Sequence, residues 1–85
     1  MPELSRFFGI VVTMYYNDHE PPHFHAYYGA FEIAIEIDTG AEAGHFPRRA
    51  RALLLEWYSL HREELTANWE RSRDRRGFRP IRPLE

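Results

Sequence analysis

Three of the five histidines of this 85-residue chain lie within seven residues, in the run Asp18-His19-Glu20-Pro21-Pro22-His23-Phe24-His25. Histidine titrates near neutral pH and is a common metal ligand, so this spacing indicates acid–base or metal chemistry. Two residues apart on a strand, His23 and His25 share one face at roughly 6–7 Å, and His19 can approach from the preceding loop. Together they could bind zinc or another divalent metal and leave one position open for water, with Glu36 as a fourth ligand or an outer hydrogen-bond acceptor.

A second hypothesis needs no metal ion. In it, His23 or His25 takes a proton from a nucleophile such as an RNA 2′-hydroxyl group, and Tyr27 or Glu36 orients that histidine. Arginines would then stabilise the phosphorane, which requires them to lie near the histidine face. A third interpretation leaves the histidines as solvent-facing strand residues beside a tight turn. The spacing does not separate the three.

All eleven basic residues are arginines, and they are unevenly distributed. Residues 1–47 hold one arginine and seven acidic residues, a net charge of −6, whereas residues 48–85 hold ten arginines and six acidic residues, a net charge of +4. The planar guanidinium group suits phosphate or carboxylate partners. We therefore expect RNA or an acidic partner to bind at Arg48, Arg49, Arg71, Arg73, Arg75 and Arg76. The alternative is that the C-terminal group only stabilises the negative end of a helix dipole.

Three strands are expected to position the histidines. The run 7–16 is rich in β-branched and aromatic residues, which predicts the first strand. The segment 17–22 contains turn residues and a diproline that cannot donate hydrogen bonds within a sheet, which predicts a loop. A second strand at 23–28 and a third at 31–37 then form a hairpin, with Gly29 in a two-residue type II′ turn.

The turn at Gly29 determines which side chains share a face of this hairpin. Its register places apolar partners together on one face: Phe24 with Ile35, Ala26 with Ile33, and Tyr28 with Phe31. On the opposite face it pairs His23 with Glu36 and Tyr27 with Glu32. The predicted site is this polar face, which holds His23, His25, Tyr27, Glu32 and Glu36.

A long helix over 47–73 is expected to cover the apolar face. Pro47 suits a first helical position, and an apolar stripe recurs at three- and four-residue steps up to Trp69. One helix is the simplest interpretation, with a kink near 59–61 as the alternative. Gly77 would terminate it, and the basic tail 74–85 would be extended. The sequence therefore predicts an α+β fold: a three-stranded antiparallel meander packed on one long C-terminal helix (βββα).

Composition indicates a single packed domain spanning 1–85. Hydrophobic residues make up 44% and aromatic residues 15% of the chain, which is typical of a globular core. The sequence has no cysteine, no secretory signal pattern at its start and no apolar run of about 18 residues, so we expect a cytoplasmic protein without membrane contact. An exposed edge at the first or third predicted strand could pair two copies as a homodimer.

Several short motifs extend across most of the chain. They are Pro2, Ser5, Phe7 or Phe8, Gly9 and Ile10; Met14, Tyr15 and Tyr16; Pro21 to His25 with Tyr28 and Gly29; and Leu55, Glu56 and Trp57 leading to His61 to Leu65, Asn68 and Trp69. With these motifs the chain resembles the small bacterial domain-of-unknown-function family numbered 4160. The HicA-type messenger-RNA-cleaving toxins are a weaker resemblance, because their first helix and the Gly-Ser before their histidine are missing here.

The resemblance implies a protein partner, since members of the family resemble two-gene toxin–antitoxin components. We therefore expect a component that binds a cognate small protein encoded nearby and RNA, with histidine-dependent endoribonuclease activity. The alternative function is a non-catalytic protein- or metal-binding module with a regulatory role.

Overall fold

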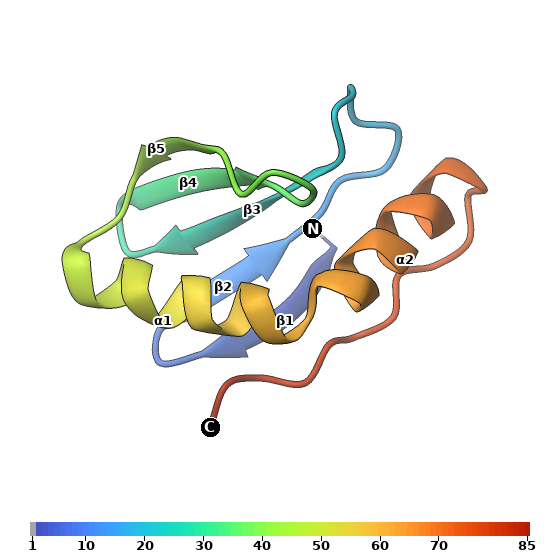
Figure 1. Ribbon diagram of the computed structural model, residues 1–85. Helices are drawn as coiled ribbons and strands as arrows, with labels where there is room; N and C mark the ends of the chain where they lie inside the picture. The colour runs from blue at the N-terminus through green and yellow to red at the C-terminus, as the bar shows by residue number, and fades with distance from the viewer. Residues whose placement is uncertain (1) are drawn as a thin grey trace.

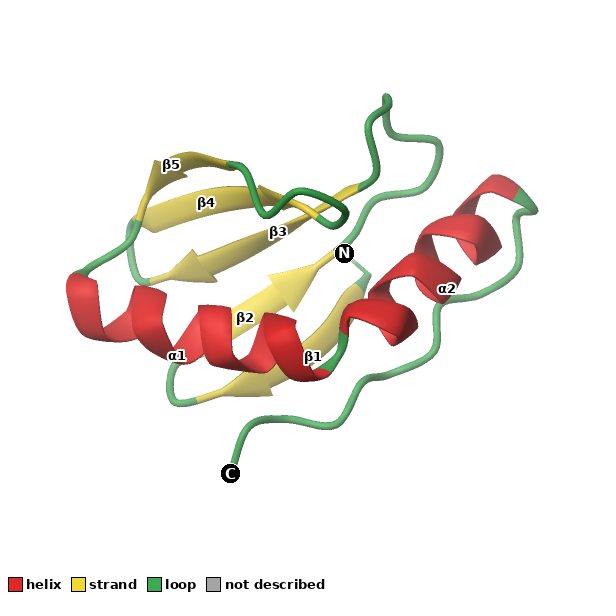
Figure 2. Cartoon of the chain, in the orientation of Figure 1, coloured by secondary structure: helices red, strands yellow, loops and turns green. Residues whose placement is uncertain are grey.

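Five antiparallel strands form a meander with both helices on one of its faces (Figures 1 and 2). A computed structural model describes residues 2–85 of the chain. The strands lie side by side in chain order: β1 (Glu3–Phe7), β2 (Ile10–Thr13), β3 (His23–Tyr28), β4 (Phe31–Glu36) and β5 (Glu42–His45). Two helices follow, α1 (Arg48–Leu60) and α2 (Arg62–Arg73). The predicted α+β class is confirmed, but the expected numbers of strands and helices are wrong.

The hairpin of β3 and β4 has the register that the sequence predicted. Phe24 opposes Ile35 and His23 opposes Glu36, and the other predicted pairs are also present. Gly29 adopts a φ of 56°, which a two-residue hairpin turn requires of its first central residue. Phe24, Ala26, Ile33 and Ile35 on the apolar face are buried, and the Phe24 ring lies 5.9 Å from the ring of Trp57 on α1, whereas Phe31 beside the turn is exposed.

The predicted first strand at 7–16 is instead a hairpin and a loop. The chain reverses at Phe8 and Gly9, whose φ angles of 48° and 82° fit a type I′ turn. Two strands therefore lie where one was expected, and β2 ends at Thr13. The turn was missed because a phenylalanine with positive φ is uncommon and gives no sequence signal.

Strand β5 was also missed, and its glycine explains how it pairs. All four of its residues are exposed, so the strand lacks an apolar alternation. Gly44 has a φ of 108°, and a Cβ atom there would lie 2.4 Å from the carbonyl oxygen of Glu32. Only glycine allows β5 to approach β4 this closely. The expected homodimer edges are consequently covered, because β1 flanks the first predicted strand and β5 flanks the third.

The single helix predicted over 47–73 is divided at His61. This residue has non-helical φ and ψ angles of −125° and 25°, and it lies at the predicted kink. Its Nδ1 atom lies 2.6 Å from Glu64 Oε1 in the first turn of α2. The two helices thus bury separate apolar sides, with Leu54 and Trp57 on α1 and Leu65 and Trp69 on α2.

The C-terminal tail packs against the sheet. It runs back past β1 (Figure 1), where the Ile81 amide donates to the Leu4 carbonyl at 2.8 Å. Trp57 Nε1 donates to the Arg82 carbonyl at 2.9 Å, and Ile81 is buried. The tail is extended, as predicted, but it belongs to the core. Among the described residues, neither helix is long and apolar enough to cross a membrane.

Candidate functional site

Asp18, His23 and His25 meet where the β2–β3 loop returns to the sheet. Strand alternation places both histidines on the face opposite α1, and the loop, with Asn17 at a φ of 56°, carries Asp18 back over them. Asp18 Oδ2 lies 2.9 Å from His23 Nε2 and 3.6 Å from His25 Nε2. One ligand atom from each of the three residues lies within 4.8 Å of the other two. This spacing is compatible with one shared metal ion.

The Asp18 carboxyl group is held in its ionised form. Burial raises its pKa, but the His19 backbone amide donates to it at 2.9 Å, and the neighbouring imidazoles of His23, His19 and His25 lower the pKa in the same direction as that bond. Together these contacts lower the pKa below its ordinary value of 3.8. Asp18 is therefore an anion at neutral pH.

His23 is the buried anchor of the cluster. Only 7% of its surface is exposed, and its Nδ1 atom lies 2.8 Å from the carbonyl oxygen of Pro21. Its ring stands 5.3 Å from that of Trp69 on α2. Both ring nitrogens face protein acceptors, so in this conformation neither is presented to a substrate.

His25 and His19 are more accessible than His23. The His25 side chain is 19% exposed, but its Nδ1 atom is buried, has no hydrogen-bond partner within residues 2–85 and lies 3.6 Å from Glu32 Oε2. His19 is largely exposed, and its Nε2 atom lies 3.8 Å from Asp18 Oδ1. The structure therefore brings together Asp18, His23 and His25, and leaves His19 at the rim. Asp18 was missed because a loop residue does not follow the strand periodicity that identified the histidines.

Two hollows flank the cluster, and His19 and His25 line both. One, of about 260 Å³, also contains Glu36 beside residues of β5. The other, of about 440 Å³, is lined by Tyr15, Tyr16, Tyr27 and Glu32 together with Asn17 and Asp18. His19 and His25 can thus be reached from both hollows.

Tyr27 and Glu36, the other two predicted catalytic residues, lie on this face but outside the cluster. The Tyr27 hydroxyl shares a 2.6 Å hydrogen bond with that of Tyr15, and this bond, with burial, raises the Tyr27 pKa well above its ordinary value. Tyr27 therefore stays neutral and cannot act as a base at neutral pH. Glu36 accepts a hydrogen bond from Thr39 at 3.1 Å and lines the smaller hollow.

The family model described as Domain of unknown function (DUF4160) matches residues 9–70. The chain belongs to the DUF4160 family. No curated protein and no solved structure matches it significantly. The family resemblance seen in the sequence is confirmed, and the matched residues include the whole cluster.

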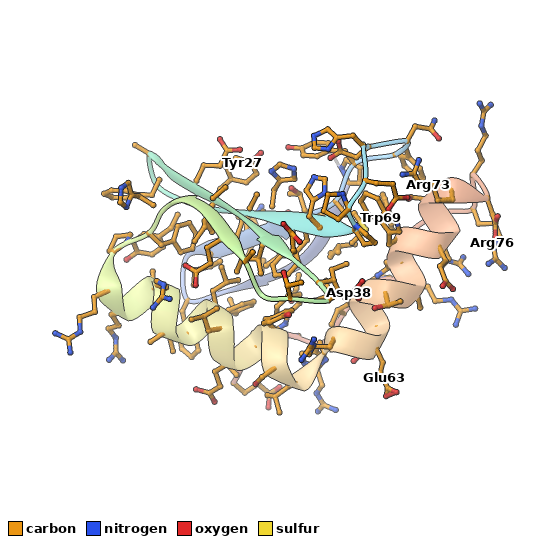
Figure 3. The ribbon with its side chains drawn as sticks, turned by 45° about the horizontal axis from the view of Figure 1, so that its top comes forward. Tyr27, Asp38, Glu63, Trp69, Arg73 and Arg76 are labelled. Atoms are coloured by element: carbon orange, nitrogen blue, oxygen red, sulfur yellow. The ribbon has the colours of Figure 1, made fainter. Side chains whose placement is uncertain are left out.

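The predicted arginines form two groups, of which only one borders the cluster of this DUF4160 domain. Arg73 donates to Glu20 of the β2–β3 loop at 2.7 Å and lies 5.0 Å from the ring centroid of Trp69. Figure 3 shows Trp69 and Arg73 reaching from α2 toward the start of β3, with Arg76 farther out. Arg71, Arg73, Arg75 and Arg76 all lie at this end of α2, which we call the α2 arginine group. The group begins one residue after the DUF4160 match ends.

The other arginines, Arg48 and Arg49, stand at the beginning of α1. Arg49 lines a separate hollow with Phe8 and Tyr28, and Tyr28 is at the opposite end of β3 from His23. Both arginines are exposed. They therefore do not meet the requirement that a phosphate-stabilising arginine should lie near the histidine face.

Proposed function

We propose that this protein is an RNA-binding component of toxin–antitoxin type that cleaves RNA at the histidine face and is controlled by a cognate small protein. The observation that carries the proposal is the contact between Arg73 and Glu20, which joins the α2 arginine group to the histidine loop. A backbone phosphate bound by these arginines lies beside the cluster. Guanidinium groups bind phosphate through paired hydrogen bonds.

The tyrosine-lined hollow supports a single-stranded ligand. Unpaired RNA bases stack on aromatic side chains, whereas the bases of a duplex are not accessible in this way. Tyr15, Tyr16 and Tyr27 line this hollow together with His25. A strand whose phosphates contact the α2 arginine group can therefore place a base among the tyrosines and its ribose near the histidines.

The proposed reaction is an internal transesterification that uses His25 and His19. One histidine removes the proton from the ribose 2′-hydroxyl group, and the 2′-oxygen then attacks the adjacent phosphorus. The bond from phosphorus to the 5′-oxygen breaks, and the other histidine donates a proton to that leaving oxygen. The products are a 2′,3′-cyclic phosphate and a free 5′-hydroxyl group.

RNA binding is tested with two double variants of equal charge. Arg75→Ala, Arg76→Ala alters the α2 arginine group, and Arg48→Ala, Arg49→Ala is the matched control at the other end of the molecule. Fluorescence anisotropy with a short single-stranded RNA should show weaker binding only for the first variant. For this variant, the slope of the logarithm of the association constant against the logarithm of the salt concentration should be smaller in magnitude by about 1.4 if two phosphate contacts are lost. Equal losses in both variants would mean non-specific attraction and contradict the proposal.

The toxin role is tested by inducible expression in a bacterial host. The parent chain should arrest growth, and a folded His19→Ala, His25→Ala variant should not. Normal growth with the parent would contradict a toxic activity in that host. Co-expression of the small protein encoded beside this chain should restore growth if that protein is the cognate partner.

A further inference from the structure

The hydrogen bond of His23 with Pro21 determines which ring nitrogen carries its proton. A carbonyl oxygen only accepts hydrogen bonds, so Nδ1, at 2.8 Å from it, is the protonated nitrogen. In neutral His23 the Nε2 atom then carries a lone pair. This lone pair is directed toward Asp18 Oδ2, 2.9 Å away.

The two facing atoms are both suited to bind a metal cation. A carboxylate oxygen and an imidazole nitrogen with a free lone pair are common metal ligands, and here they lie 2.9 Å apart. A metal cation bound by the Nε2 atom of His23 and by Asp18 Oδ2 would be held by a lone pair from each. The side chains of His23 and Asp18 are only 8% and 19% exposed, so water screens their interaction weakly.

His25 is oriented in the same way as His23. Its Nδ1 atom faces Glu32 Oε2 at 3.6 Å, and its Nε2 atom faces Asp18 Oδ2 at 3.6 Å. Each histidine thus has an acceptor beside Nδ1 and directs Nε2 toward the same carboxylate oxygen. Metal-binding histidines typically direct their second nitrogen at a carbonyl or a carboxylate, because that contact fixes the tautomer.

The distances from Asp18 to the two histidines fit a small ion. Metal bonds of the usual length place neighbouring ligand atoms about 3.0 to 3.4 Å apart in octahedral or tetrahedral geometry. The two contacts of Asp18 Oδ2, at 2.9 and 3.6 Å, are close to this range. The side of His25 that lines the smaller hollow leaves room for a water molecule or a substrate oxygen.

We propose that Asp18, through a carboxylate oxygen, and His23 and His25, through their Nε2 atoms, bind one divalent transition-metal ion of the zinc type. Two imidazoles and one carboxylate favour zinc, cobalt, nickel or iron over magnesium and calcium, which prefer oxygen ligands. Three protein ligands with an open position are typical of catalytic rather than structural zinc sites. The inference goes beyond RNA binding, because every contact that supports it lies within the protein.

The ion would change the roles in the proposed cleavage. His25 Nε2 would be a ligand, and the proton-accepting role would pass to metal-bound water, which ionises near neutral pH. His19, outside the ligand set, remains free to protonate the leaving oxygen.

The experiment uses the purified full chain after removal of metal by a chelator. Isothermal titration with Zn²⁺ should show one saturable site per chain, and Co²⁺ should give the visible absorption bands of a four- or five-coordinate complex. Mg²⁺ under the same conditions should give no saturable heat. Affinity should fall as pH decreases through about 6.5, because protons compete for the imidazole nitrogens.

Two folded variants and one control make this test specific. Asp18→Asn and His25→Gln should each weaken Zn²⁺ binding by about 100-fold or more, since each removes a ligand. His45→Gln changes an exposed histidine on β5 and should leave the affinity unchanged. Circular dichroism verifies that each variant is folded, so the buried His23 need not be altered.

The proposal is overturned if Zn²⁺ does not saturate a site, or if Asp18→Asn binds it as tightly as the parent. Either result would mean that Asp18, His23 and His25 do not form a zinc site. These titrations contain no RNA, so their failure is independent of the RNA measurements. Zinc binding without RNA binding would refute the proposed function alone, and RNA binding without saturable zinc binding would refute the metal site alone.

Discussion

Asn68 and Arg79 exchange two hydrogen bonds that fasten the C-terminal tail to α2. Asn68 Nδ2 donates to the Arg79 carbonyl at 2.9 Å, and the Arg79 amide donates to Asn68 Oδ1 at 2.8 Å. Asn68 is only 2% exposed, so neither bond can be replaced readily by water. The Asn68 side chain therefore forms with the tail the pair of backbone hydrogen bonds that a neighbouring strand would otherwise form.

We predict that Asn68→Asp destabilises the protein although its shape is almost unchanged. The carboxylate keeps the bond from the Arg79 amide but faces the Arg79 carbonyl without a proton to donate. Leaving a buried acceptor unpaired costs about 1–3 kcal/mol. Urea unfolding measures the loss, with Thr66→Ala on the exposed side of α2 as the control. Equal midpoints for Asn68→Asp and the parent would show that these two hydrogen bonds do not contribute to stability.

Gly44→Ala should destabilise the sheet, whereas Gly77→Ala should not. An alanine Cβ at Gly44 would collide with the Glu32 carbonyl, and the φ of 108° is unfavourable for any other residue. A backbone strained in this way costs about 1–3 kcal/mol. Nothing lies within 4 Å of the Cβ position at Gly77, so that variant should change the unfolding free energy by less than about 0.5 kcal/mol. Similar thermal midpoints for both variants would mean that β5 pairs more loosely than its hydrogen bonds imply.

Glu42 should contribute to the acid sensitivity of folding. Hydrogen bonds from Arg51, at 2.7 and 2.8 Å, lower the pKa of Glu42 below its ordinary value of 4.5, against a smaller opposing effect of burial. The unfolded chain then binds more protons than the folded one as pH falls below 4.5. The stabilisation is therefore present above this pH and is lost as pH falls through the lower folded value.

Glu42→Gln should flatten this part of the stability curve. Urea midpoints measured from about pH 6 down to about pH 3 should decline less steeply in the variant than in the parent. Glu56→Gln makes the same charge change at an exposed position of α1 and reports any general effect of charge. Parallel curves for the parent and Glu42→Gln would contradict the assigned role of the Arg51 contact.

His19→Ala distinguishes the histidine-only metal set from the set containing Asp18. His19 Nε2 is 3.8 Å from Asp18 Oδ1 and its side chain is largely exposed, so the structure predicts a Zn²⁺ affinity within about threefold of the parent. RNA cleavage by the same variant should fall strongly if His19 protonates the leaving group. A loss of zinc binding equal to that of Asp18→Asn would instead restore His19 to the ligand set.

Sequence periodicity predicted the structure correctly where that structure depends on residues close together in the chain. Gly29 defined the hairpin register, and this register placed His23, His25 and Tyr27 on the open face. Strand β5 has no such pattern, because its pairing depends on the space left by the missing Cβ of Gly44. The turn at Phe8 adopts a conformation that its residue type disfavours.

The composition of the cluster depended on a loop path that local patterns do not encode. Asp18 reaches the histidines because the β2–β3 loop folds back over the sheet. Likewise, Arg73 approaches the loop only because α2 changes direction at His61. Contacts between segments 53 residues apart, such as Arg73 with Glu20, become visible only in three dimensions.

Glu20 and a phosphate ligand would compete for the guanidinium group of Arg73. A phosphate that displaces Glu20 from Arg73 removes one contact of the loop that carries Asp18. Phosphate binding at the α2 arginine group and cation binding at the cluster would then be thermodynamically linked, and each would alter the affinity for the other by the same factor. The pair is partly exposed, and such bonds contribute at most about 1 kcal/mol, or roughly a fivefold effect. Because this surface ion pair is of ordinary strength, an anion bound at the α2 arginine group could change the affinity of Asp18, His23 and His25 for a cation only to this limited extent.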